Sequence, residues 1–159
     1  MKRLAVALVA LSVGASAAPA PRLDMTAFFT GRTHAENVLK IAFHRSTRLI
    51  VDSVGRTVGR DFVLVDTVRE EGKPVRTRKW VMHPAGPNRF TGSLSDAVGP
   101  VEVSVSGRSA QIRYTMKGGL KVDQALDLQG DGRTLTNRVS VKRFGLRFAR
   151  VEGKIRKLD

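Results

Sequence analysis

Short runs of alternating apolar and polar residues recur along the chain, and each ends at a turn signal. The segments VEVSVS (residues 101–106) and QIRYTM (residues 111–116) both alternate in this way, which is the pattern of a strand with one buried and one solvated face. Glycine-containing pairs such as Gly107-Arg108 and Gly118-Gly119 separate the runs, because glycine readily adopts the positive φ of tight turns. Roughly eight to ten strands spaced by about ten residues predict an all-β fold, either an antiparallel sandwich or a closed barrel.

The stretch NRVSVKRFGLRFARVEGKIRK, residues 137–157, fits two structures. As a helix it places Phe144, Phe148 and Val151 on one face beside a row of basic residues, which is typical of helices that lie on membranes. As a hairpin it turns at residues 143–145 and alternates on both sides of the turn. Gly145 and Gly153 would each weaken a helix by up to about 1 kcal/mol relative to alanine. Periodicity therefore favours the hairpin and leaves the helix open.

The N-terminus has the three parts of a secretory signal peptide. Lys2 and Arg3 precede an apolar run over residues 4–13, and Ala15-Ser16-Ala17 fits the small-residue rule for cleavage. The run is about half of the twenty or so apolar residues that cross a bilayer. We expect a signal peptide over residues 1–17, a short extended segment over residues 18–27, and a single domain over residues 28–159.

The net charge of the chain indicates which kinds of binding partner it favours. The chain carries 28 Lys and Arg residues against 14 Asp and Glu residues, a net charge of +14. This charge favours anionic partners such as phospholipids, lipopolysaccharide or nucleic acid, and the predicted export argues against nucleic acid. The basic residues are spread along the chain, so a solvated basic surface explains them as well. The sequence has no cysteine, which excludes disulfides and a lipid anchor on cysteine, so we expect a soluble, exported periplasmic protein.

Four segments have a recognisable pattern: FFTG (residues 28–31), the run from Asp66 through Gly72 to Trp80, FTGSLSDAVGPVEVSVSG (residues 90–107) and residues 137–157. Together they resemble a family of small exported bacterial proteins of unknown function with a lipocalin-like fold. The family's Gly-x-x-x-Asp-x-x-Gly element matches Gly92, Asp96 and Gly99, and its Arg-Phe-Gly element matches residues 143–145. The resemblance covers most of residues 28–156 and implies an antiparallel lipocalin-like β-barrel, with residues 137–157 as a hairpin. Many relatives resemble lipoproteins, from which this chain departs by lacking the cysteine.

No motif in the sequence points to catalysis or to a metal. His34, His44 and His83 form no His-Glu-x-x-His pattern, and no serine lies in a Gly-x-Ser-x-Gly elbow. The segment GRTVGRDF, residues 55–62, lacks the lysine of a phosphate-binding loop. We therefore expect no catalytic residues, no metal, no cofactor and no enzymatic activity.

Two sets of residues are candidates for binding. Inward side chains of a barrel of about eight strands either fill the interior or line a space for one small ligand, and the candidate lining residues are Phe62, Trp80, Met82, Tyr114 and Met116. The alternative is that these residues are simply core. The candidates for an anionic surface are Arg143, Arg147, Arg150 and Lys154. We expect a protein that binds a hydrophobic or amphiphilic small molecule. The alternative is an interaction protein that uses its basic surface on anionic lipid, lipopolysaccharide or another envelope protein.

Overall fold

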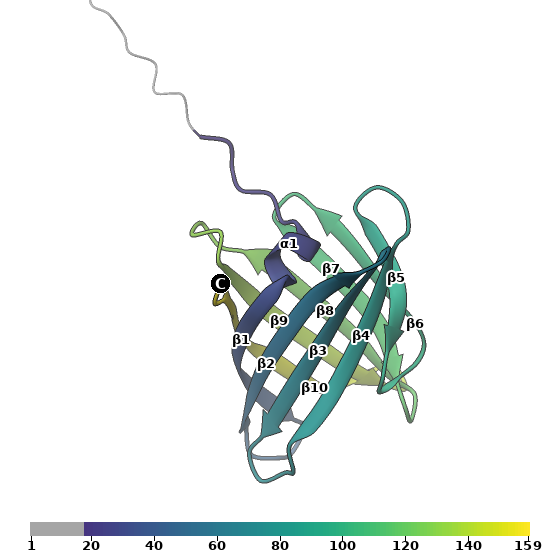
Figure 1. The fold of residues 1–159 in the computed structure, drawn as a ribbon. Coiled ribbons are helices and arrows are strands. Elements are labelled where there is room, and N and C mark those ends of the chain that lie inside the picture. Colours follow the sequence, from purple (N-terminus) through teal and green to yellow (C-terminus); the bar gives the residue numbers. More distant parts are fainter. Residues whose placement is uncertain (1–17) are drawn as a thin grey trace, which may run out of the picture.

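Residues 18–159 of the computed structural model form ten antiparallel strands and one short helix (Figure 1). The predicted signal peptide, residues 1–17, lies outside the described residues. The elements are α1 (Met25–Phe29), β1 (Gly31–Ile41), β2 (Thr47–Val58), β3 (Asp61–Glu70), β4 (Arg76–Pro84), β5 (Arg89–Leu94), β6 (Ala97–Ser106), β7 (Ser109–Met116), β8 (Leu120–Leu128), β9 (Thr134–Arg143) and β10 (Leu146–Lys157). No helix in this part of the chain is long and apolar enough to span a membrane.

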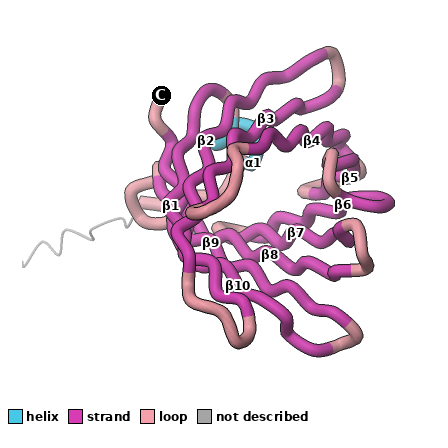
Figure 2. Tube along the Cα trace, turned by 90° about the horizontal axis from the view of Figure 1, so that it is seen from below, coloured by secondary structure: helices cyan, strands magenta, loops and turns pink. Residues whose placement is uncertain are grey.

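The strands form a closed barrel in which each strand pairs with its neighbours along the chain. The barrel closes where β1 pairs with β10, from Thr33 opposite Lys157 to Ile41 opposite Ala149. Seen along its axis, the strands form a ring around the interior, with α1 near β2 and β3 (Figure 2). This architecture confirms the predicted all-β, lipocalin-like barrel, and the number of strands is at the upper end of the expected range.

Residues 137–157 form the β9–β10 hairpin, as the alternation and the resemblance predicted. The turn consists of Phe144 with φ 51° and Gly145 with φ 78°, and two positive φ angles are what a type I′ turn requires. Val151 lies opposite Val139, and both point into the barrel, while the neighbouring Arg150, which pairs with Ser140, is exposed. The amphipathic helix is thereby excluded for this segment.

The helix α1 corrects the expectation of an extended segment over residues 18–27. Residues 18–24 have no regular structure, but Met25 begins a helix whose N-cap, Asp24, accepts a hydrogen bond from the backbone N–H of Ala27 at 2.9 Å. Phe28 and Phe29 are buried against the barrel. Five helical residues are too few to show a helical period in the sequence. The capping residue Asp24 is therefore the one local feature that indicates a helix start.

Several contacts fix α1 over one mouth of the barrel. Lys157 Nζ donates to the backbone carbonyls of Phe28 and Thr30 at 3.2 and 2.5 Å, which satisfies carbonyls at the helix end. A Cβ atom at Gly55 would lie 2.0 Å from the Phe29 carbonyl oxygen, so the absent side chain lets α1 rest directly on β2. The helix is therefore part of the fold and covers the barrel interior at this end (Figure 1).

Candidate functional site: a cavity inside the barrel

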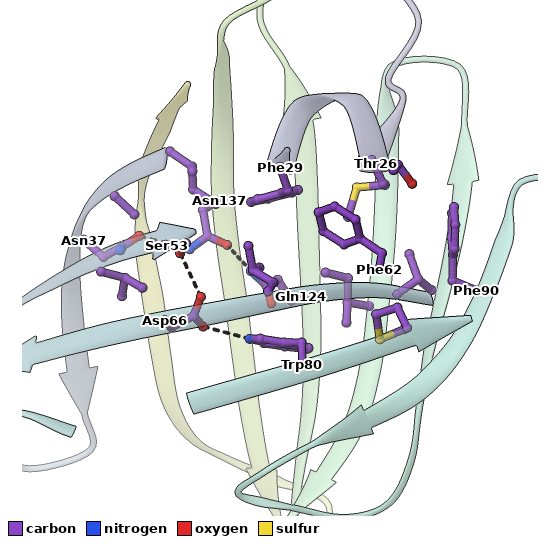
Figure 3. A pocket seen from close by; sticks show the side chains of 18 residues that line it. Thr26, Phe29, Asn37, Ser53, Phe62, Asp66, Trp80, Phe90, Gln124 and Asn137 are labelled. Atoms are coloured by element: carbon purple, nitrogen blue, oxygen red, sulfur yellow. Dashed lines mark hydrogen bonds between the residues drawn. The ribbon is translucent and has the colours of Figure 1, made fainter. Parts of the chain in front are cut away.

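The barrel interior holds a cavity of about 130 Å³ directly beneath α1 (Figure 3). Every strand and α1 contribute lining side chains. A dry apolar cavity of roughly 150 Å³ is known to hold one benzene molecule. The space is therefore large enough for one small ligand and is not a packing defect of a single methyl group.

One part of the lining is apolar. Phe62, Met82 and Phe90 come from neighbouring strands β3, β4 and β5, and Met25 and Phe29 cover them from α1 (Figure 3). These side chains offer large, polarizable surface and no charge. This part of the cavity suits the hydrocarbon portion of a ligand.

The opposite part is polar and internally hydrogen-bonded. Asn137 Nδ2 donates to Asn37 Oδ1 at 3.0 Å, and Gln124 Nε2 donates to Asn137 Oδ1 at 2.8 Å. Asn37 and Asn137 are both buried. Buried amides are costly unless paired, so this chain across β1, β9 and β8 fixes three amides that can also meet a polar ligand group.

Asp66 is the one ionisable side chain that residues 18–159 contribute to the cavity lining. Its carboxylate accepts hydrogen bonds from Ser53 Oγ at 2.7 Å and from Trp80 Nε1 at 2.8 Å (Figure 3). Only 6% of the residue is exposed. Burial raises the pKa of the Asp66 carboxyl, against the two hydrogen bonds and the charge of Arg78, which lower it. The cavity therefore contains a buried acid that is harder to ionise than an ordinary aspartate.

Replacing Asp66 with asparagine should remove a pH-dependent part of the stability. A carboxyl whose pKa is higher in the folded than in the unfolded chain stabilises the fold most below the unfolded value, about 3.9, and this stabilisation is lost as pH rises through the folded value. From acid to neutral pH, the wild type should therefore lose stability relative to Asp66→Asn. Urea unfolding followed by circular dichroism across this range measures the difference, and a pH-independent difference would contradict the assignment.

Below Trp80, a second cluster of side chains packs against the indole on the side away from the cavity. Arg78 places its guanidinium 5.1 Å from the centre of the Trp80 ring and donates to the Tyr114 hydroxyl at 3.3 Å. Its Nε also lies 3.3 Å from Asp96 Oδ1, near enough for an ion pair although not aligned as a hydrogen bond. Tyr114 packs edge-on against Trp80, with ring centres 5.6 Å apart. The cluster holds the indole of Trp80 in place.

The structure places the five predicted lining residues at two levels. Phe62, Trp80 and Met82 line the cavity. Tyr114 packs behind Trp80 and Met116 packs on the edge of the core, and neither borders the cavity. The polar lining residues were not predicted: Asn37, Ser53, Asp66, Gln124 and Asn137. One signal for them existed, because Asn137 takes an inward position in the alternating row of β9 between Leu135 and Val139.

The predicted basic residues lie on the outside of the β9–β10 hairpin. Arg143, Arg147, Arg150 and Lys154 are all exposed. Arg150 and Lys154 occupy the outer face of β10, and Arg143 and Arg147 flank the turn. They are therefore separate from the cavity.

The histidines also lie outside the barrel interior. His34 Nδ1 is 2.6 Å from Asp52 Oδ1, His83 Nδ1 is 2.5 Å from Asp61 Oδ1, and His44 is exposed in the β1–β2 loop. The hydrogen bond to Asp52 is the main cause that raises the pKa of His34. Between residues 18 and 159, no three His, Cys, Asp or Glu side chains converge on a point where a metal could bind.

Comparison with known proteins agrees with the fold and identifies the family. The solved structure titled "Crystal Structure of Rv2717c from M. tuberculosis" is similar to this chain, with a TM-score of 0.62 and 12% identity, over 84% of this chain and 94% of that chain. At this identity the likeness shows a shared fold alone. No curated protein matches the chain in sequence. A family model described as "Protein of unknown function (DUF3833)" matches residues 4–157, and the chain belongs to this family.

Proposed function

We propose that this protein is an exported, non-enzymatic binding protein that holds one small amphiphilic molecule inside its barrel. The observation that carries the proposal is the two-part lining of the cavity, apolar beneath α1 and polar around Asn37, Asp66 and Asn137. A small-molecule site of this kind is a mostly apolar space with a few fixed polar groups that set the ligand's orientation. Export is supported by the basic start, apolar run and small residues of the N-terminus.

The charge of the lining indicates which polar group the ligand carries. Among the lining residues in the described part of the chain, Asp66 is ionisable, and no lysine, arginine or histidine accompanies it. An anionic group would meet a carboxyl instead of a cation, and its desolvation would not be compensated. A hydroxyl, an amide or an ammonium group could bond to the amides or to Asp66. We therefore expect a ligand with a neutral or cationic polar end.

Three probes with the same hydrocarbon chain test this preference. Trp80 is the chain's one tryptophan and lines the cavity, so its fluorescence reports binding directly. We expect 1-hexanol and hexylammonium to change the emission saturably at neutral pH, and heptanoate to have little effect. Binding of all three alike would contradict the role of Asp66, and binding of none would contradict the function.

A cavity-filling variant provides the control. Val103 lines the cavity and Val105, two residues further along β6, does not. Val103→Phe should abolish the response, and Val105→Phe should retain it, provided that both variants melt cooperatively. Native mass spectrometry of protein taken from the periplasm of a Gram-negative host should show loss of residues 1–17 and, for the wild type, a discrete added mass.

A further inference from the structure

The barrel end opposite α1 displays apolar side chains that nothing between residues 18 and 159 covers. The four residues Phe43, Phe144, Leu146 and Phe148, here called the apolar tip, are exposed, and Phe43 and Phe144 reach 107% and 91% of full exposure. Single exposed apolar residues are ordinary, but several together on one surface mark an interaction site.

The tip is a single patch built from two loops. The backbone N–H of Ala42, next to Phe43, donates to the Phe148 carbonyl at 3.0 Å, and Ile41 pairs with Ala149. The β1–β2 loop therefore lies beside the β9–β10 turn. Because β1 runs from α1 down the barrel (Figure 1), this patch is at the far end from α1 and from the mouth that α1 covers.

Two of the tip residues adopt a backbone conformation that their side chains disfavour. Phe43 has φ 63° and Phe144 has φ 51°, in the left-handed region that Gly, Asn and Asp tolerate best. A type I′ turn prefers Asn or Gly where Phe144 stands. Phe144 is 91% exposed and has the Arg143 guanidinium 5.3 Å from its ring centre, a surface contact that contributes little to folding. A contact outside the molecule explains the side chain better.

A row of cationic side chains crosses the outer face of the barrel beside the apolar tip. Lys121, Lys142 and Arg147 lie directly opposite one another on β8, β9 and β10, and Arg150 lies opposite Lys40 on β1. Like charges directly across a sheet are destabilising. Within residues 18–159, Lys121, Lys142, Arg147 and Arg150 form no ion pair, and Lys40 has one with Glu152 at 4.0 Å. The described part of the chain therefore leaves most of this row without anionic partners, and it can attract the anions of another molecule.

We propose that this end of the barrel docks on an anionic phospholipid bilayer. Phe43, Phe144 and Leu146 would enter the boundary between headgroups and acyl chains, as the apolar faces of interfacial proteins do. The cationic row would contact lipid phosphates, and each Lys or Arg near such a surface contributes about 1 kcal/mol of attraction, or roughly a fivefold increase in partitioning. The combination of exposed aromatic residues with unpaired cations fits a charged bilayer better than it fits an uncharged one or an apolar protein groove.

Sedimentation with vesicles tests the apolar part of the proposal. The purified protein should bind vesicles containing about 30 mol% phosphatidylglycerol in phosphatidylcholine and bind pure phosphatidylcholine weakly. Phe43→Ser with Phe144→Ser should weaken binding by about tenfold. The matched control, Val54→Ser with Val58→Ser, removes two exposed apolar side chains toward the α1 end of β2 and should bind as the wild type does.

A charge-reversal pair tests the electrostatic part. Lys142→Glu with Arg147→Glu should lower partitioning by at least about tenfold. Arg56→Glu with Arg60→Glu changes the net charge equally near the β2–β3 turn and should have a much smaller effect. Circular dichroism checks that all variants fold.

Three results would overturn the proposal. Equal losses from both charge reversals would show attraction by net charge alone. Wild-type binding by the double serine variant would show that the apolar tip does not insert. A dimer in solution that the serine pair abolishes, without vesicle binding by the wild type, would assign the tip to a second copy of this chain.

Discussion

Val151→Asp should lower the free energy of unfolding by about 3–5 kcal/mol, a large part of the roughly 5–15 kcal/mol that keeps a typical domain folded. Val151 is 9% exposed on the inner face of β10, opposite Leu39 on β1 and Val139 on β9. An aspartate there would bury a carboxylate without a partner. The change also lies in the strand that closes the barrel, so the lost packing affects both of its neighbours.

The adjacent residue supplies the control. Arg150 is exposed on the outer face, opposite Lys40 and Ser140, so Arg150→Asp should change the unfolding free energy by no more than about 0.5 kcal/mol. Urea unfolding followed by circular dichroism measures both variants. A stable Val151→Asp protein with a destabilised Arg150→Asp protein would mean that β10 presents the other face to the interior.

The hairpin that contains Val151 shows what alternation can predict. The apolar positions of residues 137–157 recur every second residue on both sides of Gly145, and in the structure the same positions face inward. Side-chain direction in a strand depends on parity alone, which is a local property. The turn was predicted for the same reason, since its positive φ requirement is met by Gly145 and is visible in the sequence.

Closure of the barrel and the presence of α1 depend on contacts that sequence alone does not show. The pairing of β1 with β10 joins residues more than a hundred positions apart, and no local pattern distinguishes it from two open sheets. The helix α1 is held by Gly55 and by Lys157, both distant in the chain. The cavity follows from these two features, because α1 covers the interior that closure creates.

The sequence predicted which side chains face the barrel interior, but not how high along the barrel axis each one lies. Phe62, Trp80, Met82, Tyr114 and Met116 all have inward or edge positions, yet only the first three border the cavity. Height along the axis is set by the stagger of each strand against the next, which accumulates around the ring. Trp80 pairs with Leu64 and Leu94, whereas Tyr114 is reached only through three further strands, β5 to β7. Alternation therefore selects inward residues without saying which ones meet.

Gly153→Ala should cost about 2–4 kcal/mol and disturb the polar end of the cavity. Gly153 lies between Asn37 on β1 and Asn137 on β9, in register with both. A Cβ atom there would be 2.1 Å from the Glu36 carbonyl oxygen and 2.5 Å from Asn37 Oδ1. Because the nearest obstacle is backbone, β1 must move away from β10, and the hydrogen bond from Asn137 to Asn37 would be strained or lost.

The same substitution at Gly130 separates this clash from the general effect of replacing glycine. A Cβ atom at Gly130 would meet no atom within 4 Å, so Gly130→Ala should leave stability within about 0.5 kcal/mol of the wild type. Adding Asn37→Ala to Gly153→Ala tests the cause, since removing the amide leaves the Glu36 carbonyl in place and should not restore stability. Full recovery in that double variant would mean that the clash is with the flexible amide alone, and that Gly153 serves the polar end of the cavity instead of the closure of β1 on β10.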